Sequence, residues 1–207
     1  MKNLLSMKTP VLALFISLVA FGACVSNKQT QPSTDYTQLV NPFIGTDFTG
    51  NTYPGAQAPF GMVQLSPDNG LPGWDRISGY YYPDSTIAGF SHTHLSGTGA
   101  GDLYDISYMP VTLPYREAEA PLGIHSKFRH SDEEASAGYY RVLLKDYNIN
   151  VELTATERCG IQRYTFPKAQ SAVFLNLKKA MNWDFTQDSH IEVVDSCTIQ
   201  GLSLIHI

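Results

Sequence analysis

Basic residues are scarce in this chain, above all in its first half. Lys and Arg together number 14 against 19 Asp and Glu, and Arg76 is the single basic residue between Asn41 and Tyr115. A nucleic-acid surface needs clustered Lys and Arg to displace counterions from phosphates. The composition therefore excludes a nucleic-acid partner. The same segment is rich in aromatic residues, and a weakly charged aromatic surface suits neutral ligands with apolar faces, sugars above all.

An apolar run long enough to span a bilayer is missing near the N-terminus. The run "PVLALFISLVAFGA" covers 14 residues after Lys2 and Lys8, a length and charge pattern typical of a signal peptide. It ends at Cys24 in a sequence similar to a bacterial lipobox, with Phe21 where leucine is usual. We therefore expect a signal peptide at 1–23, a lipidated Cys24 that anchors the protein to a membrane, and a flexible tether over 24–38. The protein is then an exported lipoprotein of the cell envelope, facing the periplasm or the cell surface.

Cysteine is rare as well, with three residues in the chain. Cys24 is assigned to the lipobox, which leaves Cys159 and Cys197. An oxidising compartment would allow these two to pair, but nothing in the sequence fixes the distance between them. The sequence leaves the pairing open and favours two separate buried thiols.

The last six residues, "LSLIHI", are interpreted as foreign to the natural protein. Their coding string resembles a transposon end used in sequencing libraries. We expect residues 202–207 to be an artefact, the natural chain to continue beyond Gly201, and His206 to belong to no site. Residues 39–201 then form one incomplete domain, long enough to bury a core.

A helical period is absent from residues 41–115, which are dense in proline and glycine. Short apolar clusters bounded by turn formers indicate strands and loops there. Further along, Ile149, Val151, Leu153 and Ala155 fall on one face of an extended strand. Strands that recur without intervening amphipathic helices predict an all-β fold, an antiparallel β-sandwich. The charged segment 130–138 is interpreted as a solvated loop.

The segment "GFSHTHLSGTGAGD", residues 89–102, combines two histidines with a glycine-rich stretch. In a strand, His92 and His94 would share a face and could bind one metal with a third ligand. Candidate third ligands are Asp84, Asp102 and Asp105. The alternative is that the histidines form hydrogen bonds within a polar loop. A phosphate loop is set aside because no helix and no lysine follow the glycines.

Three longer motifs decide between these alternatives. The chain contains, in order, "NPFIGTDFTGNTYPGAQAPFGMVQLSPD", "GWDRISGYYYPDSTIAGFSHTHLSGTGAGDLYDISYMP" and "VELTATERCGIQRYTFP". Together they resemble the N-terminal domain of the family 92 glycoside hydrolases, the exo-acting α-mannosidases of Bacteroidota. The chain departs from the family at Gln162, where histidine is more common, and at Arg76-Ile77, where a bulkier or cysteine-containing pair is common.

The resemblance implies a two-domain enzyme in which a β-sandwich packs on a C-terminal (α/α)6 barrel. Its substrates are α-mannosides of glycans, and hydrolysis is calcium-dependent and inverting, with one carboxylic acid and one carboxylate flanking the bond. In the family, the catalytic pair and the calcium ligands belong to the C-terminal domain. We therefore expect no catalytic and no metal-binding residue in this chain, which alone would be inactive. A stand-alone carbohydrate-binding lipoprotein is the alternative.

The resemblance also assigns the N-terminal domain a wall of the sugar site. Trp74 would stack on the sugar next to the cleaved bond, and Asp75 would accept hydrogen bonds from its hydroxyls. A core role for Trp74 is disfavoured because Gly73 and Asp75 flank it. His92 and His94 would be polar contacts at the sugar-facing junction of the domains rather than metal ligands, and Trp183 is taken as a core residue.

Overall fold

The computed structural model describes residues 34–97, 103–115, 123–177 and 185–205. The predicted signal peptide and the lipidated Cys24 lie outside these ranges, as do Asp102, Trp183 and His206. Their assignments stay predictions. The strands all belong to the unit Tyr36–Ile207.

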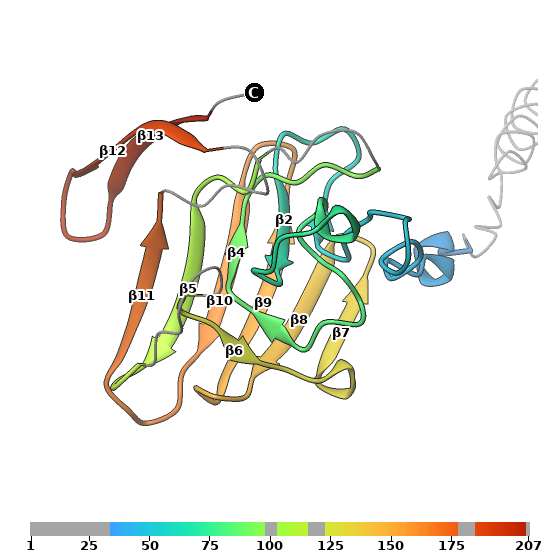
Figure 1. The fold of residues 1–207 in the computed structure, drawn as a ribbon, viewed down its shortest axis with the longest axis horizontal. Coiled ribbons are helices and arrows are strands. Elements are labelled where there is room, and N and C mark those ends of the chain that lie inside the picture. The colour runs from blue at the N-terminus through green and yellow to red at the C-terminus, as the bar shows by residue number, and fades with distance from the viewer. Residues whose placement is uncertain (1–33, 98–102, 116–122, 178–184, 206–207) are drawn as a thin grey trace, which may run out of the picture. The chain divides into compact units, whose positions relative to one another are not determined.

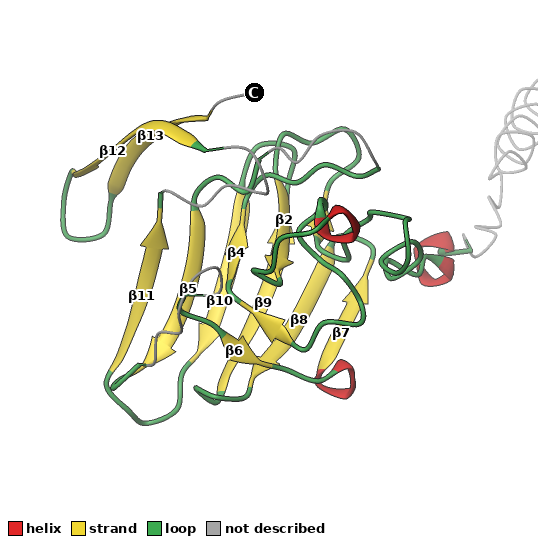
Figure 2. Ribbon diagram, in the orientation of Figure 1, coloured by secondary structure: helices red, strands yellow, loops and turns green. Residues whose placement is uncertain are grey.

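Short strands joined by turns make up almost all of the regular structure (Figure 2). The strands are β1 (Ala56–Gln57), β2 (Gln64–Asp68), β3 (Thr86–Ile87), β4 (Gly89–Ser91), β5 (Ser107–Thr112), β6 (Ser126–Lys127), β7 (Glu133–Ser136), β8 (Tyr139–Leu144), β9 (Ile149–Ala155), β10 (Gly160–Thr165), β11 (Ser171–Asn176), β12 (Thr186–Val193) and β13 (Ile199–Ile205). Three 3-10 turns accompany them, η1 (Tyr36–Leu39), η2 (Trp74–Arg76) and η3 (His130–Asp132). Within the described ranges, no helix has both the length and the apolar character that crossing a membrane requires.

Two larger sheets form the body of the domain (Figure 1). One has the strand order β1-β2-β4-β5-β11 and the other the order β10-β9-β8-β7. Two smaller sheets pair β12 with β13 and β3 with β6. Neighbouring strands are antiparallel in all four. The predicted antiparallel β-sandwich is confirmed.

The core lies between the two larger sheets. Leu65 and Phe90 on the first sheet belong to one buried cluster with Val142, Val151 and Leu153 on the second. β1 and β2 lie against β9, so the faces that bury these side chains meet directly. Burial of apolar surface at about 25 cal/mol per Å² is the main force that holds the sheets together.

The alternation predicted for residues 149–155 is confirmed. In β9 the side chains of Ile149, Val151 and Leu153 are buried, whereas the residues between them are partly exposed. A strand places successive side chains on opposite faces, so this period of two is the expected signature of a strand with one face in the core.

The prediction of a solvated loop at 130–138 is wrong. Residues 130–132 form η3 and residues 133–136 form β7, which pairs with β8. The side chain of Glu133 is only 1% accessible, because two tyrosine hydroxyls and a histidine surround its carboxylate.

The expectation of buried thiols is also wrong. Cys159 and Cys197 are both free and both exposed. Cys159 belongs to the turn between β9 and β10, and Cys197 belongs to the turn between β12 and β13. Turn residues rarely reach the core, so their exposure follows from where the strands end.

Candidate functional site

Trp74 opens the short turn η2, on the loop that joins β2 to β3. The turn follows Gly73, whose backbone has φ of 151°, a conformation that residues other than glycine rarely adopt. The Arg76 N–H donates to the Gly73 carbonyl at 3.0 Å and closes the turn. Trp74 is 53% exposed, and Asp75 beside it is half-buried. Trp74 therefore lies on a surface loop and not in the core, as the sequence predicted.

An ion pair spans the loop that carries Trp74. The Arg76 guanidinium donates from Nε to Asp84 Oδ2 and from Nη2 to Asp84 Oδ1, each at 2.6 Å. The hydrogen bond with Asp84 raises the pKa of Arg76 above its usual range. The guanidinium also lies over the Tyr81 ring, 4.6 Å from its centroid. Both carboxylate oxygens of Asp84 are thus bonded to Arg76. In this structure Asp84 is the partner of Arg76 and does not join the histidines in a metal site.

His94 lies inside the domain. Its ring nitrogens both meet acceptor oxygens, with Nε2 2.8 Å from Asp68 Oδ1 and Nδ1 2.7 Å from the Gln64 carbonyl. Ser91 and Ser107 donate their hydroxyls to the same Asp68 carboxylate, at 3.0 and 3.4 Å. The accessible fraction of the His94 side chain is 0%. Its contacts with Gln64 and Asp68 join the segment after β4 to strand β2. Contact of His94 with a sugar stays a prediction.

The backbone that follows η2 rests on this buried pair. A Cβ placed on Gly79 would lie 3.0 Å from Asp68 Oδ1 and 3.0 Å from the His94 ring. The Tyr104 ring meets His94 edge-on with centroids 5.3 Å apart, and its hydroxyl donates to the Ile77 carbonyl. The structure therefore brings His94 next to the loop that presents Trp74.

His92 lies in a different environment from His94. Because β4 ends at Ser91, the strand geometry that would place both rings on one face does not extend to them. The His92 ring lies against Gly160 of the other sheet. Its Nδ1–H donates to the Ile106 carbonyl at 3.4 Å, so Nε2 of the neutral ring is an acceptor. Burial lowers the pKa of His92 below its ordinary value of 6.5, which favours that neutral form.

The two histidines therefore do not converge on one ligand. Asp105 accepts a hydrogen bond at 3.0 Å from Ser203, a residue of the C-terminal segment 202–207 that is interpreted above as an artefact. Within the part of the chain that the structure describes, no group of three His, Cys, Asp or Glu side chains is placed to hold a metal ion.

The structure shows two buried carboxylates that the sequence did not predict. Asp68 is the partner of His94, and Glu133 accepts hydrogen bonds from the hydroxyls of Tyr80 at 2.8 Å and Tyr140 at 2.7 Å. His130 Nδ1 lies 2.5 Å from the same carboxylate. Burial raises the pKa of both tyrosines, which keeps them as donors. A single sequence offers no signal for either carboxylate, since partners far apart in the chain create both sites.

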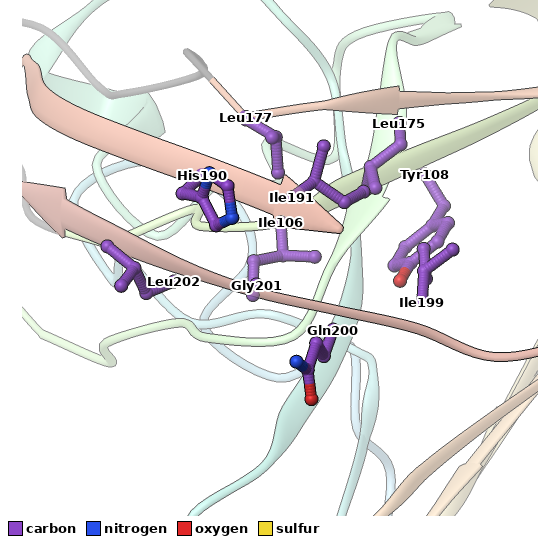
Figure 3. Close-up of a pocket in the computed structure, with 10 residues that line it drawn as sticks. All are labelled: Ile106, Tyr108, Leu175, Leu177, His190, Ile191, Ile199, Gln200, Gly201 and Leu202. Carbon is purple, nitrogen blue, oxygen red and sulfur yellow. The ribbon is translucent and has the colours of Figure 1, made fainter. Parts of the chain in front are cut away.

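A pocket of about 150 Å³ lies between β5, β11 and the β12–β13 hairpin (Figure 3). Apolar side chains such as Ile106, Leu175 and Ile191 line it, together with the polar groups of His190 and Gln200. Trp74, Asp75, His92 and His94 are not among its lining residues. The pocket is therefore separate from the surface that the sequence singled out.

The family whose profile matches this chain is the glycosyl hydrolase family 92 N-terminal domain, over residues 39–206. A solved family 92 α-mannosidase from Bacteroides thetaiotaomicron is 39% identical, with a TM-score of 0.77 over 82% of this chain and 24% of that one. An inverting mannosidase of the same family and organism has a TM-score of 0.59 at 22% identity, over 85% of this chain and 29% of that one. This second likeness shows the fold alone.

A secreted glycosidase from the fungus Arthroderma benhamiae is 28% identical over 161 residues, which is 73% of this chain and 20% of that protein. The chain thus spans about a quarter or less of these relatives, apart from the second mannosidase. The profile matches far more than half of the chain, and the solved α-mannosidase shares its fold. The chain belongs to glycosyl hydrolase family 92, in which it corresponds to the N-terminal domain.

Proposed function

We propose that this domain is the N-terminal part of an exo-α-mannosidase that acts on α-mannosides of glycans. The observation that carries the proposal is the 39% identity to a solved α-mannosidase over 82% of this chain. The chain spans 24% of that enzyme, so we propose the activity for the longer protein. Its own C-terminal domain, of the (α/α)6 type, would then be the first partner of the present domain.

The exposed turn at Trp74 supports a role for this domain in the sugar site. An indole ring can cover the C–H face of a pyranose, and a neighbouring carboxylate can accept from hydroxyls. Trp74 and Asp75 would supply these two groups from adjacent positions. His92 would offer Nε2 as a hydrogen-bond acceptor. His94 would act indirectly, because it bonds Asp68 at the end of β2, where the loop that carries Trp74 begins.

The inverting, calcium-dependent chemistry is proposed for the longer protein and not for this domain. Inversion needs an acid and a base on opposite faces of the sugar, with carboxyl groups roughly 6.5–9.5 Å apart. Asp68, Asp84 and Glu133 are buried and bonded to His94, Arg76 and two tyrosines respectively. Calcium prefers six to eight oxygen ligands, and among the described residues no group of three His, Cys, Asp or Glu side chains is placed to hold a metal ion. We therefore assign the catalytic carboxylates and the calcium site to the C-terminal domain of the longer protein.

Export of the protein is part of the proposal. The related fungal glycosidase is described as secreted, which supports a location outside the cytoplasm. Attachment of a lipid to Cys24 would keep the domain at the cell envelope, where extracellular or periplasmic glycans are accessible.

The experiment is to recover the gene together with the sequence downstream of Gly201, and to assay the full-length protein on defined α-mannobioses. We expect release of mannose that a calcium chelator abolishes and added calcium restores. The present chain is the control and should hydrolyse no mannoside. A stop codon directly after Gly201 would refute the enzyme and favour a carbohydrate-binding lipoprotein. Hydrolysis that survives thorough chelation would refute the calcium requirement.

A further inference from the structure

The loop that carries Trp74 is closed by a bidentate ion pair between Arg76 and Asp84. Both hydrogen bonds are 2.6 Å long, and the side chains are 22% and 7% accessible. A guanidinium that meets both oxygens of a carboxylate is fixed in direction as well as distance. The low exposure shields the pair from solvent, unlike an ordinary surface ion pair.

Further contacts hold the two ends of this loop in place. The Tyr81 ring lies beneath the Arg76 guanidinium at 4.6 Å, a distance at which a cation and an aromatic ring attract each other. The Asp84 N–H donates to the Tyr81 carbonyl at 3.0 Å, and the Gly79 N–H donates to the Arg76 carbonyl at 2.9 Å. Arg76 is thus bonded to Gly79 through its backbone carbonyl and to Asp84 through its side chain.

Trp74 is placed by the same turn. Only Asp75 separates it from Arg76, and the turn itself is three residues long and is closed by the hydrogen bond from Arg76 to Gly73. An isolated turn of that length is not stable in water, because fixing its dihedral angles costs more than one hydrogen bond contributes. A rigid anchor at Arg76 therefore helps to hold the turn that carries the exposed Trp74 ring.

We propose that Arg76 is a positioning residue, which through its ion pair with Asp84 holds the Trp74 turn in the conformation that binds the sugar. This inference rests on the proposed function of Trp74 as a sugar-facing residue. A pre-ordered aromatic ring does not lose its freedom on binding, and immobilising one such side chain costs about 0.5–1.5 kcal/mol. Loss of the ion pair should therefore weaken substrate binding by about 2- to 13-fold, which is this free-energy range converted to a ratio of dissociation constants.

The first measurement concerns Trp74 alone and does not depend on any sugar. The chain has two tryptophans, so Trp183→Phe leaves Trp74 as the only one. In that background, Arg76→Met keeps the aliphatic stem and removes the guanidinium. We expect time-resolved fluorescence anisotropy to show a larger amplitude of nanosecond motion, and acrylamide to quench Trp74 more strongly. Arg163→Met is the matched control, because Arg163 forms a similar two-bonded pair with Glu152 between β10 and β9.

The second measurement uses the full-length protein on an α-mannobiose. Arg76→Met should raise KM by about 2- to 13-fold with kcat within about twofold of wild type, the pattern of lost uniform binding. Arg163→Met should change neither constant. If Arg76→Met fails to fold, Arg76→Lys serves instead, because an ammonium keeps the charge but cannot bond both oxygens in the same fixed fork.

The outcomes separate this inference from the proposed function. Unchanged anisotropy and quenching in Arg76→Met would overturn the positioning role, whatever the kinetics show. Normal KM in Arg76→Met together with impaired Trp74→Ala would overturn it as well, and would leave the function of Trp74 intact. Normal kinetics in Trp74→Ala would instead refute the sugar-facing role of Trp74 and with it the effect of Arg76 on substrate.

Discussion

His94 and Asp68 form a polar pair in the interior of the domain, with 2.8 Å between Nε2 and Oδ1. Both side chains are almost fully enclosed, at 0% and 2% accessibility. Removing one partner of such a pair takes from the other its shortest side-chain contact in the interior, and breaking a buried pair in this way typically costs about 3–5 kcal/mol. We expect His94→Leu and Asp68→Asn each to lower the free energy of unfolding by that amount, measured by urea denaturation.

A surface ion pair provides the control for these two variants. Arg141 and Glu134 are 50% and 58% accessible, so Arg141→Met should cost less than about 1 kcal/mol. The double variant of His94 and Asp68 should cost less than the sum of the single variants, because the two residues share one interaction. A cost below about 1 kcal/mol for His94→Leu would contradict a structural role of the pair.

Trp74→Ala should impair the full-length enzyme without unfolding it. Loss of one stacking face should cost about 1–3 kcal/mol, by analogy with tryptophans at interface hot spots. This corresponds to a decrease of roughly 5- to 150-fold in kcat/KM. The decrease should be larger for a disaccharide than for a mannoside with a small activated leaving group, because the ring would contact the leaving sugar. An unchanged kcat/KM combined with a large drop in thermal midpoint would contradict this role.

Gly79→Ala should strongly destabilise the domain. Gly79 has φ of +89°, and a Cβ there would lie 2.4 Å from the Tyr104 ring. A left-handed backbone costs a residue with a Cβ about 1–2 kcal/mol, and overpacking adds about 1–3 kcal/mol. Gly138→Ala separates the two effects, because Gly138 has φ of +75° and open space where a Cβ would be. Equal losses of stability in the two variants would show that the contact with Tyr104 contributes nothing.

Glu133→Gln should destabilise the domain by about 1–3 kcal/mol, the cost of a buried polar group left without a partner. The Glu133 carboxylate accepts from both Tyr80 and Tyr140, whereas the NH₂ group of glutamine accepts nothing. Glu134→Gln is the matched control on the same strand, since Glu134 is exposed, and it should change stability by less than about 1 kcal/mol. Urea denaturation measures both, and equal effects would argue against a buried network at Glu133.

His92 should make stability depend on pH below about 6.5. Burial lowers its folded-state pKa from 6.5, so the unfolded chain binds the proton more readily. The contribution of His92 is therefore complete above the unfolded pKa and decreases as the pH falls below it, down to the folded pKa. His92→Gln removes this titration. The slope of unfolding free energy against pH between 7.5 and 5.5 should be smaller in the variant, and equal slopes would contradict the prediction.

Local patterns were sufficient for the fold class. The alternation of Ile149, Val151 and Leu153 is a property of neighbouring residues, and a strand with one buried face requires it. The exposure of Trp74 was likewise predictable, because Gly73 allows a backbone conformation that belongs to loops. These features depend on a few adjacent residues and can therefore be predicted from a single sequence.

The tertiary structure alone decided which polar residues are buried and what they bond. Glu133 stands in a charged segment that is typical of a solvated loop, yet Tyr80, 53 positions away, donates to its carboxylate. His92 and His94 are two positions apart, but β4 ends before them and their rings meet different partners. Asp68 is 26 positions from His94. Pairing of strands brings such groups together, and the sequence near each residue carries no record of its distant partner.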